Sequence, residues 1–232
     1  MTTVDPAAVS VVMTVRNGER HVAAAITSIL GQSRPPVEIL VVDDGSTDAT
    51  VGVLADFGDM VRVVRQPARG AAAGLNRGVA MATGDAIAFL DADDVWTPDA
   101  IARRLERMDE ADAPDGVFGR TTQFVSPELT VAEGRHLRFG AGPVSAPLLG
   151  SLVVRREVVE RVGPFDESLS SAEGVDWVTR ARDDGVRLVA IDDIVLRRRL
   201  HATNTGRTLP REATLTALRR VVHEHHRRRR ER

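Results

Sequence analysis

The chain has 232 residues, of which 43% are hydrophobic and 28% charged, a composition typical of a globular protein of one ordinary domain. Its net charge of −2 provides no global field for binding nucleic acid, and the absence of cysteine excludes disulfides, thiolate nucleophiles and cysteine-ligated metals. Lysine is also absent, which excludes Schiff-base chemistry and a P-loop lysine. No apolar run approaches the ~20 residues of a membrane span and residues 1–6 do not resemble a signal peptide, so we expect a cytoplasmic protein.

Strands and helices are predicted to alternate through the first half of the chain. Short apolar runs predict strands over 9–15, 38–42, 60–64 and 86–90. Helical patterns follow them over about 22–30, 51–57, 70–82 and 98–110, with Ser46 or Thr47 expected to cap the second helix and Thr97 the fourth. Because each strand is a continuous apolar run between helices, this pattern predicts an α/β fold with a mostly parallel central sheet and helices on both faces.

The second half follows a less regular pattern. Residues 112–150 are rich in Gly, Pro, Ser and Thr, with a strand-like piece over 116–125, and loops of this kind often carry recognition. We expect a strand over 151–154, a turn at 163–166, a helix over 173–182, and two strands over 186–191 and 194–200. Pro210 precedes a final helix that becomes a His- and Arg-rich tail.

Acidic residues follow two of the predicted strands. Asp43 and Asp44 come directly after 38–42, and Asp91, Asp93 and Asp94 come after 86–90. In parallel sheets ligands bind outside the carboxyl ends of the strands, so both clusters are expected on one rim. Carboxylates this close repel one another unless a cation compensates, and Mg²⁺ prefers oxygen ligands, including substrate phosphates. The sequence therefore predicts a metal and ligand site at this rim, in preference to a solvated acidic loop.

An ordered set of motifs covers nearly the whole chain: Val9-Ser10-Val11-Val12-Met13-Thr14-Val15-Arg16-Asn17-Gly18, Val41-Val42-Asp43-Asp44-Gly45-Ser46-Thr47-Asp48, Asn76-Arg77-Gly78, Gly84-Asp85, Phe89-Leu90-Asp91-Ala92-Asp93-Asp94 and Val162-Gly163-Pro164-Phe165-Asp166-Glu167. Over about residues 9–204 this set resembles glycosyltransferase family 2. The resemblance implies the A-type glycosyltransferase fold as a single domain, with a nucleotide-sugar-binding half over 9–111, an acceptor-binding half over 112–204, and a C-terminal helix and basic tail over 205–232. It implies an inverting transfer from a nucleotide sugar, by preference a UDP-sugar, with Mg²⁺ or Mn²⁺.

Carried over by position, the resemblance also implies roles for single residues. Asp43 is expected at the nucleobase with Asp44 near the same pocket, Asp91 near the ribose, and Asp93 on the metal, with His201 approaching the metal or diphosphate; Thr14, Arg16 and Ala92 complete the expected donor contacts. One of Asp43 and Asp44 can equally form an Asx turn that caps the next helix. Arg16 stands where the family commonly has an aromatic residue, and Leu75 where it commonly has an arginine, so the contact set is incomplete.

A general base must receive the proton of the acceptor hydroxyl. Many family members open the helix after the Phe165-Asp166-Glu167 turn with a Glu-Asp pair, but here Gly174 stands in place of the usual Asp. Either Glu173 or Asp176 must then serve, and the two lie at positions i and i+3 of one helix. We favour Asp176, which is deeper in the helix beside Trp177, where burial raises a carboxyl pKa; an acid in the first turn, as at Glu173, is also a common response to the helix dipole.

The partners expected are a nucleotide-sugar donor and a hydroxyl acceptor, which is a glycan, a lipid-linked sugar, a natural product or a peptide, and no nucleic acid. The basic tail is interpreted as solvated because it includes glutamates and shows no apolar anchor; the alternative is peripheral contact with the inner face of an anionic membrane. Two other functions remain open. A catalytically silent nucleotide-sugar-binding subunit is compatible with the missing Glu-Asp pair, whereas a nucleotidyltransferase is expected to have a Gly-rich basic signature that residues 17–20 do not supply.

Overall fold

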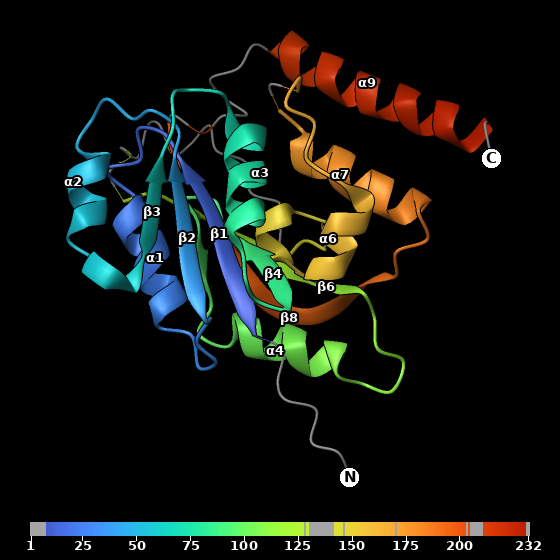
Figure 1. Ribbon diagram of the computed structural model, residues 1–232, viewed down its shortest axis with the longest axis horizontal. Coiled ribbons are helices and arrows are strands. Elements are labelled where there is room, and N and C mark those ends of the chain that lie inside the picture. Colours follow the sequence, from blue (N-terminus) through green and yellow to red (C-terminus); the bar gives the residue numbers. More distant parts are fainter. Residues whose placement is uncertain are drawn as a thin grey trace.

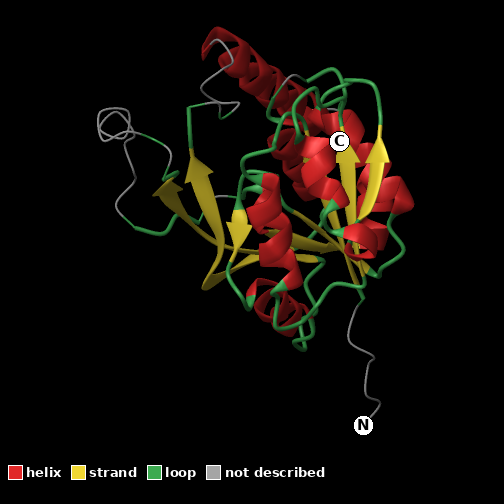
Figure 2. Cartoon of the chain, turned by 90° about the vertical axis from the view of Figure 1, so that its left-hand side faces the viewer, coloured by secondary structure: helices red, strands yellow, loops and turns green. Residues whose placement is uncertain are grey.

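One eight-stranded sheet runs through the part of the chain that the computed structural model describes, which is residues 8–127, 129, 142–145, 147–169, 171–202, 204 and 211–230 (Figure 1). The strands lie side by side in the order β3, β2, β1, β4, β7, β6, β8, β5. Their bounds are β1 Val9–Val15, β2 Glu38–Asp43, β3 Arg62–Arg65, β4 Ala86–Phe89, β5 Val95–Trp96, β6 Gly116–Val125, β7 Leu152–Arg155 and β8 Leu188–Leu200. Figure 2 shows these strands diverging strongly in direction, as the natural twist of a sheet requires.

Helices cover both faces of the sheet, as predicted. They are α1 Val22–Leu30, α2 Thr50–Ala55, α3 Ala71–Met81, α4 Ala100–Met108, α6 Arg156–Val162, α7 Glu173–Asp183 and α9 Arg211–Arg230, with 3-10 turns at Gly58–Met60 and Leu149–Ser151. Along β1, Val11 and Met13 join one core cluster with α1 and α4, whereas Val12 joins the other with α3, α6 and α7. Alternate side chains of a buried strand thus feed two hydrophobic layers, which explains its continuous apolar sequence.

The strand directions bring the predicted ligand rim together. β1 pairs in parallel with β2 and β4, and β2 pairs in parallel with β3. Val15, the last residue of β1, lies opposite Asp43 of β2, while Phe89 of β4 lies opposite Val12 of β1. The acidic turns that follow β2 and β4 therefore emerge at the same edge of the sheet. Beyond β4 the sheet becomes mixed, because β7 runs antiparallel to both β4 and β6.

The observed elements differ from the predicted ones in several places, most of them in the second half. The two strands expected over 186–191 and 194–200 form one continuous strand, β8, in which the exposed Asp192 and Asp193 pass beside a register shift against β6. A β-bulge admits such residues without ending the strand. The basic segment is also helical further than expected, because α9 continues to Arg230. The two-residue strand β5 and the helix α6 were not predicted.

The expected helix caps were wrong in detail. Asp99, and not Thr97, occupies the N-cap position of α4, and the Thr97 hydroxyl donates instead to the carbonyl of Ile194 at 2.8 Å. Ser46 does not cap α2, because its hydroxyl accepts the backbone N–H of Asn17 at 2.9 Å. Both side chains thus join segments distant in the sequence, which local pattern reasoning does not detect.

Several residues of the sequence motifs hold the architecture together. Gly78 of α3 packs so closely on β1 that a Cβ at this position would lie 2.4 Å from the Cγ1 of Val12. The side-chain amide of Asn76 donates to the carbonyl of Phe165 at 3.0 Å, and its oxygen accepts the Phe165 N–H at 2.8 Å. Phe165 in turn packs edge-on against Phe89 and beside Trp177. These motif residues hold the elements beneath the acidic turns in place and are not part of those turns.

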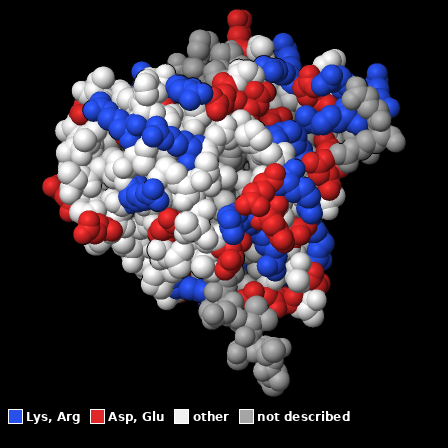
Figure 3. Space-filling view, in the orientation of Figure 1, with Lys and Arg blue, Asp and Glu red and all other residues white. Residues whose placement is uncertain are grey.

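The surface is mixed in charge. Acidic and basic side chains are interspersed over the face seen in Figure 3, in agreement with the small net charge of −2. Among the described helices, none combines the length and the apolar character needed to cross a bilayer.

Candidate functional site

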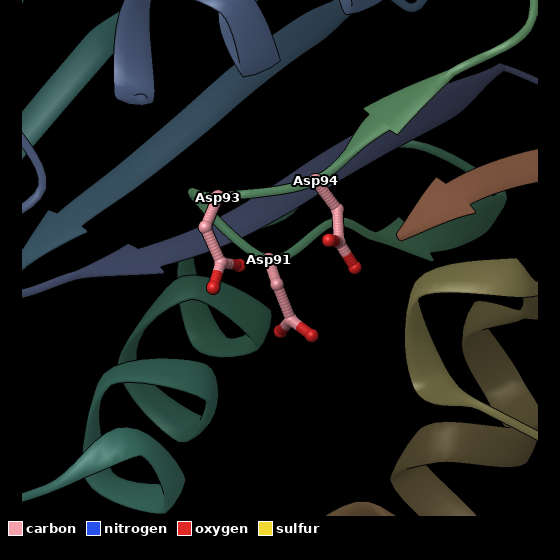
Figure 4. A group of neighbouring side chains, drawn as sticks. All are labelled: Asp91, Asp93 and Asp94. Carbon is pink, nitrogen blue, oxygen red and sulfur yellow. The ribbon is translucent and has the colours of Figure 1, made fainter. Parts of the chain in front are cut away.

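Three aspartates occupy the turn between β4 and β5. One carboxylate oxygen from each of Asp91, Asp93 and Asp94 lies within 4.8 Å of the other two, and Figure 4 shows the three side chains leaving the same short turn. The Asp94 N–H donates to the carbonyl of Asp91 at 3.1 Å, which closes the turn. Asp91 is exposed, Asp93 is partly buried and Asp94 is buried, so the cluster extends from the solvent into the protein.

Asp93 is the member that contacts the C-terminal half of the chain. Its Oδ2 lies 2.9 Å from Nε2 of His201 and accepts a hydrogen bond from the side chain of Asn204 at 3.1 Å. The ring of His21 lies 4.6 Å from that of His201, measured between centroids. Burial acts to raise the pKa of Asp93, but the hydrogen bond and positive charge of His201 outweigh it and hold the pKa below its usual value. The structure therefore brings together the two residues predicted as metal ligands.

The other two carboxyl groups are shifted in the opposite direction. Burial, followed by the charges of Asp93 and Glu173, raises the pKa of Asp91 to about 7, against the opposing charge of Arg198. Burial and the charges of Asp91 and Asp93 raise the pKa of Asp94 well above its usual value. The ionised forms of Asp91 and Asp94 are therefore disfavoured next to one another, and a bound cation would favour them.

Asp94 has a definite position, which the sequence left open. Its Oδ1 accepts the backbone N–H of Arg199 at 2.7 Å, and the Arg199 side chain donates back to the carbonyl of Asp93 at 2.8 Å. Together these bonds attach the acidic turn to the end of β8. Asp94 thus holds the turn in place with one oxygen.

Asp43 and Asp44 both bind neighbouring protein groups. The two oxygens of Asp44 accept three hydrogen bonds of 2.8 Å, from the side chain of Gln66 and the backbone N–H groups of Arg69 and Gly70, just before α3. Asp43 accepts the Ser46 N–H at 3.1 Å and forms an ion pair with Arg65 at 3.1 Å.

The burial of Asp43 bears on its expected contact with a nucleobase. Its side chain has no exposed surface, whereas that of Arg65 is 60% exposed. A direct contact between Asp43 and a ligand would therefore require movement of Arg65 or of the turn around Ser46. The three hydrogen bonds of Asp44 hold the 66–70 loop in place.

The remaining expected donor contacts lie at the same rim. Thr14 is partly buried on β1, where a Cβ on Gly74 of α3 would come within 3.0 Å of its side chain. Arg16 is exposed beyond the end of β1. Ala92 is partly buried, and a Cβ on Gly18 would approach its Cβ to 4.0 Å, so the loop after β1 lies beside the acidic turn.

The structure separates the two candidate bases. Asp176 is buried, as expected, but its Oδ2 pairs with Nε of Arg180 at 2.8 Å, and Arg180 also donates to the carbonyls of Val162 and Pro164. Asp176 therefore takes part in fixing the turn before α7. Glu173, in the first turn of α7, acts on the pKa of Asp91 through its charge, which places it close to the acidic cluster.

Sequence analysis did not identify two residues that lie near the cluster. Arg198 is partly buried and lowers the pKa of both Asp91 and Asp94 through its charge. The run of arginines at 197–199 was the available signal, but it did not indicate which of the three faces the acids. His21 gave no signal at all, because its stacking against His201 joins residues 180 positions apart.

This fold is that of an α/β protein with its acidic clusters at the carboxyl ends of parallel strands, where such sheets usually bind ligands. The sequence model of glycosyl transferase family 2 matches residues 10–160, and the chain belongs to that family. The predicted family is confirmed.

Curated relatives agree with this assignment. An uncharacterized glycosyltransferase of Nostoc is 33% identical over 68% of this chain and 54% of its own length. The glycosyltransferase AglE of Haloferax volcanii is 29% identical over 81% of this chain and 65% of its own, and the pre-mycofactocin glycosyltransferase of Mycobacterium tuberculosis is 31% identical over 78% and 40%. The chain spans about half to two thirds of the length of the first two of these relatives and less of the third.

Solved structures confirm the A-type glycosyltransferase fold. S. aureus TarS in complex with UDP-GlcNAc superimposes with a TM-score of 0.72 at 18% identity, covering 92% of this chain and 65% of that one. The mannosyltransferase PcManGT of Pyrobaculum calidifontis, in complex with GDP-Man and Mn²⁺, gives a TM-score of 0.66 at 22% identity, covering 87% of this chain and 59% of that one.

Proposed function

We propose that this chain transfers a glycosyl group from a nucleoside-diphosphate sugar, by preference a UDP-sugar, to an acceptor hydroxyl with inversion at the anomeric carbon. The observation that carries the proposal is the convergence of Asp91, Asp93, Asp94 and His201 at the carboxyl end of β4, beside the charge of Glu173. Membership of the family and the rim geometry support it together. The acceptor class stays open among glycans, lipid-linked sugars, natural products and peptides.

The residues present fit a hard divalent cation, Mg²⁺ or Mn²⁺. Three carboxylates offer oxygens within 4.8 Å of one another, and burial and like charge raise the pKa values of Asp91 and Asp94, an arrangement that a bound cation would relieve. Asp93 and His201 would hold the ion, with Asp91 on the solvent side. When bound, the ion offsets the charge that develops on the departing nucleoside diphosphate. Arg198 is positioned near the same acids to donate to phosphate oxygens.

The charge effect of Glu173 on Asp91 and the pairing of Asp176 with Arg180 favour Glu173 as the general base. A base must lie within hydrogen-bond reach of the attacking hydroxyl and near the leaving-group site. Glu173 lies close enough to Asp91 to shift its pKa, whereas the carboxylate of Asp176 is buried and paired with Arg180. We therefore assign the acceptor proton to Glu173 and the positioning of α7 to Asp176.

The nucleoside end of the donor is assigned to the rim formed by β1 and β2. We assign Asp43 to the nucleobase after release from Arg65, Asp44 to holding the 66–70 loop, and Thr14 and Arg16 to the adjoining wall. A carboxylate offers several acceptor sites, so Asp43 can keep its bond from Ser46 while accepting a base N–H.

Calorimetry with UDP, in the presence and absence of Mn²⁺, tests the donor and metal parts. We expect UDP binding that depends on Mn²⁺ and is weakened at least about tenfold by Asp93→Asn, since one ligand charge is lost. The exposed Asp56→Asn is the matched control and is expected to bind like the wild type. Equal binding without Mn²⁺ and in Asp93→Asn would contradict the metal site.

Hydrolysis of the donor separates an enzyme from a silent binding subunit. A panel of nucleotide sugars, screened first by thermal shift, is incubated with the protein and the released nucleoside diphosphate is measured. Release above the Asp93→Asn background is expected for at least one donor. Tight binding without release across all donors and acceptors would favour the silent subunit, which the glycine at Gly174 keeps as the second candidate.

A further inference from the structure

The C-terminal helix α9 is attached to α7 along a narrow seam. Ala217 and Val221 of α9 are buried in a small cluster with Leu169, just before α7. At the other end of the seam, the buried carboxylate of Asp183 pairs with His225 at 2.9 Å and with Arg228 at 3.3 Å. An ion pair of 3.4 Å between Arg220 and Asp166 adds a third contact, so α9 is fixed to the body of the protein along one side.

Beside this seam runs an exposed apolar stripe. Its members are Leu215 (40% exposed), Leu218 (36%) and Val222 (53%) on α9, and Val175 (43%) on α7. Positions 215, 218 and 222 follow the i, i+3, i+7 spacing that places side chains on one face of a helix. The stripe borders a hollow between the two helices, lined by Val175, Thr179, Arg182, Leu218, Val221, Val222 and His225. Large apolar side chains are thus gathered where solvent reaches them.

Basic side chains adjoin the stripe. The sequence of α9 contains seven arginines and two glutamates, although the whole chain has a net charge of −2. Arg219 is exposed, and it lies four positions after Leu215 and three before Val222, so it shares their face. Arg182 lines the hollow from the side of α7. In Figure 3 basic side chains, interspersed with acidic ones, lie at the upper right, where Figure 1 places α9.

We propose that this face of α7 and α9 docks the protein on an anionic lipid bilayer. An interfacial helix of this kind combines apolar side chains, which enter the headgroup region, with basic side chains, which attract anionic lipids. Two such signals together give stable but peripheral attachment. A second copy of the chain is a poor occupant, because pairing two such faces would bring like charges together. The sequence of the basic tail showed no apolar anchor. In the folded protein, α9 and Val175 together supply one.

The docking goes beyond the proposed transfer reaction and is testable without it. It has one consequence for the site: α7 begins at Glu173, near the acidic cluster, and runs alongside α9. Docking through α9 would therefore hold the acidic cluster near the lipid surface, with α7 between them.

Vesicle sedimentation with the full chain tests the docking. We use vesicles of phosphatidylcholine alone and of phosphatidylcholine with about one third phosphatidylglycerol, at low and high salt. Binding is expected for the mixed vesicles only and is expected to fall with salt. The double variant Leu218→Asp/Val222→Asp should bind at least about tenfold more weakly, because it removes apolar side chains and adds two negative charges that anionic lipids repel. Arg219→Gln, which leaves the packing intact, should bind roughly fivefold more weakly.

Val37→Asp is the matched control, because Val37 is a 59% exposed valine that precedes β2, at the amino ends of the strands. It should bind as the wild type does. Thermal melts of all variants establish that they fold, and Arg219→Gln keeps the test decisive if the double variant does not. No binding to mixed vesicles, or unchanged binding in Arg219→Gln, would overturn the proposal. A dimer in solution that the Leu218→Asp/Val222→Asp change dissolves would assign the face to a second copy instead.

Discussion

The three aspartates of the turn after β4 are close in sequence but have different surroundings. Asp94 is buried and bound to the backbone of Arg199, Asp93 is bound by His201, and Asp91 faces solvent. Asp94 therefore positions the turn, Asp93 is held by His201, and Asp91 is left exposed to solvent. This division follows from burial and partners, since the residue type is the same in all three.

The contrast between Glu173 and Asp176 gives a prediction at the residue scale. Glu173→Gln is expected to lower donor turnover by about 10²- to 10⁴-fold with little change in melting temperature, because it removes the proposed general base at a partly buried position and keeps the size of the side chain. Asp176→Asn is expected to lower stability by about 1–2 kcal/mol through the weakened bond to Arg180, and to retain most of its turnover. Release of nucleoside diphosphate and thermal melts measure the two effects. The opposite result, with turnover lost only in Asp176→Asn, would make Asp176 the base.

At this scale the sequence predicted which residues gather at the rim but not what they contact. Asp93 and His201 were both expected near the metal, and they lie 2.9 Å apart. Asp44 and Asp176 were expected to meet a ligand or a proton, yet their oxygens bind the 66–70 loop and Arg180. Motif positions constrain the backbone, whereas a carboxylate takes whichever donors tertiary packing brings to it.

The start of β2 shows how one side chain joins several elements. Oε1 of Glu38 accepts hydrogen bonds from the hydroxyl of Ser10 on β1 at 2.6 Å, and from the N–H and hydroxyl of Thr83 after α3, both at 2.7 Å. Burial acts to raise the pKa of Glu38, but these bonds and the charge of Arg62 lower it below its usual 4.5. The ionised form is therefore the one that the folded state binds better.

This shift predicts a pH-dependent stability difference. Because the folded pKa lies below the unfolded value, the contribution is complete above about pH 4.5 and is lost as pH falls through the folded pKa. Glu38→Gln should therefore reduce the free energy of unfolding by about 1–2 kcal/mol at pH 7 and by less at pH 4. Urea unfolding at several pH values measures the difference. Glu160→Gln, in an exposed pair with Arg156, is the control and should change stability by less than about 0.5 kcal/mol. A deficit that does not shrink at low pH would contradict this account.

Element prediction succeeded where one local signal dominates. β1, β2 and β4 are continuous apolar runs that alternate with helical patterns, and this combination indicates buried parallel strands. β6 was predicted with its observed bounds, Gly116–Val125. The prediction of β8 was wrong, because the adjacent Asp192 and Asp193 suggested a turn. In the structure they lie within the strand, beside a register shift against β6. Strand β5 is two residues long, and its pairing with β8 is a tertiary contact without a periodic signal.

At the scale of the whole molecule, the two halves share one sheet. β4 of the first half pairs with β7 of the second, so the sheet continues across the boundary expected near residue 111. The clamp of Asn76 on Phe165 joins the halves a second time, on the α3 face, and Asn76 also donates to Glu167 at 3.1 Å. The halves are therefore expected to unfold together.

Removal of this clamp gives the prediction at this scale. Asn76→Ala leaves the Phe165 N–H and carbonyl without their partner, so we expect a loss of about 2–3 kcal/mol in the free energy of unfolding. Since the β4–β7 pairing remains, the loss should appear as a lower midpoint of a single transition with an unchanged m-value. Urea unfolding followed by both tryptophan fluorescence and circular dichroism tests this, because Trp96 and Trp177 lie in the two halves.

Arg77→Ala is the matched control on the same helix, where an exposed arginine donates to the carbonyl of Arg65. It should change stability by less than about 0.5 kcal/mol. Two separate transitions in Asn76→Ala would mean that the clamp, and not the shared sheet, couples the halves. An unchanged midpoint would mean that water replaces the amide at no cost, and that the Asn76-Arg77-Gly78 motif acts through the close packing of Gly78 on Val12 alone.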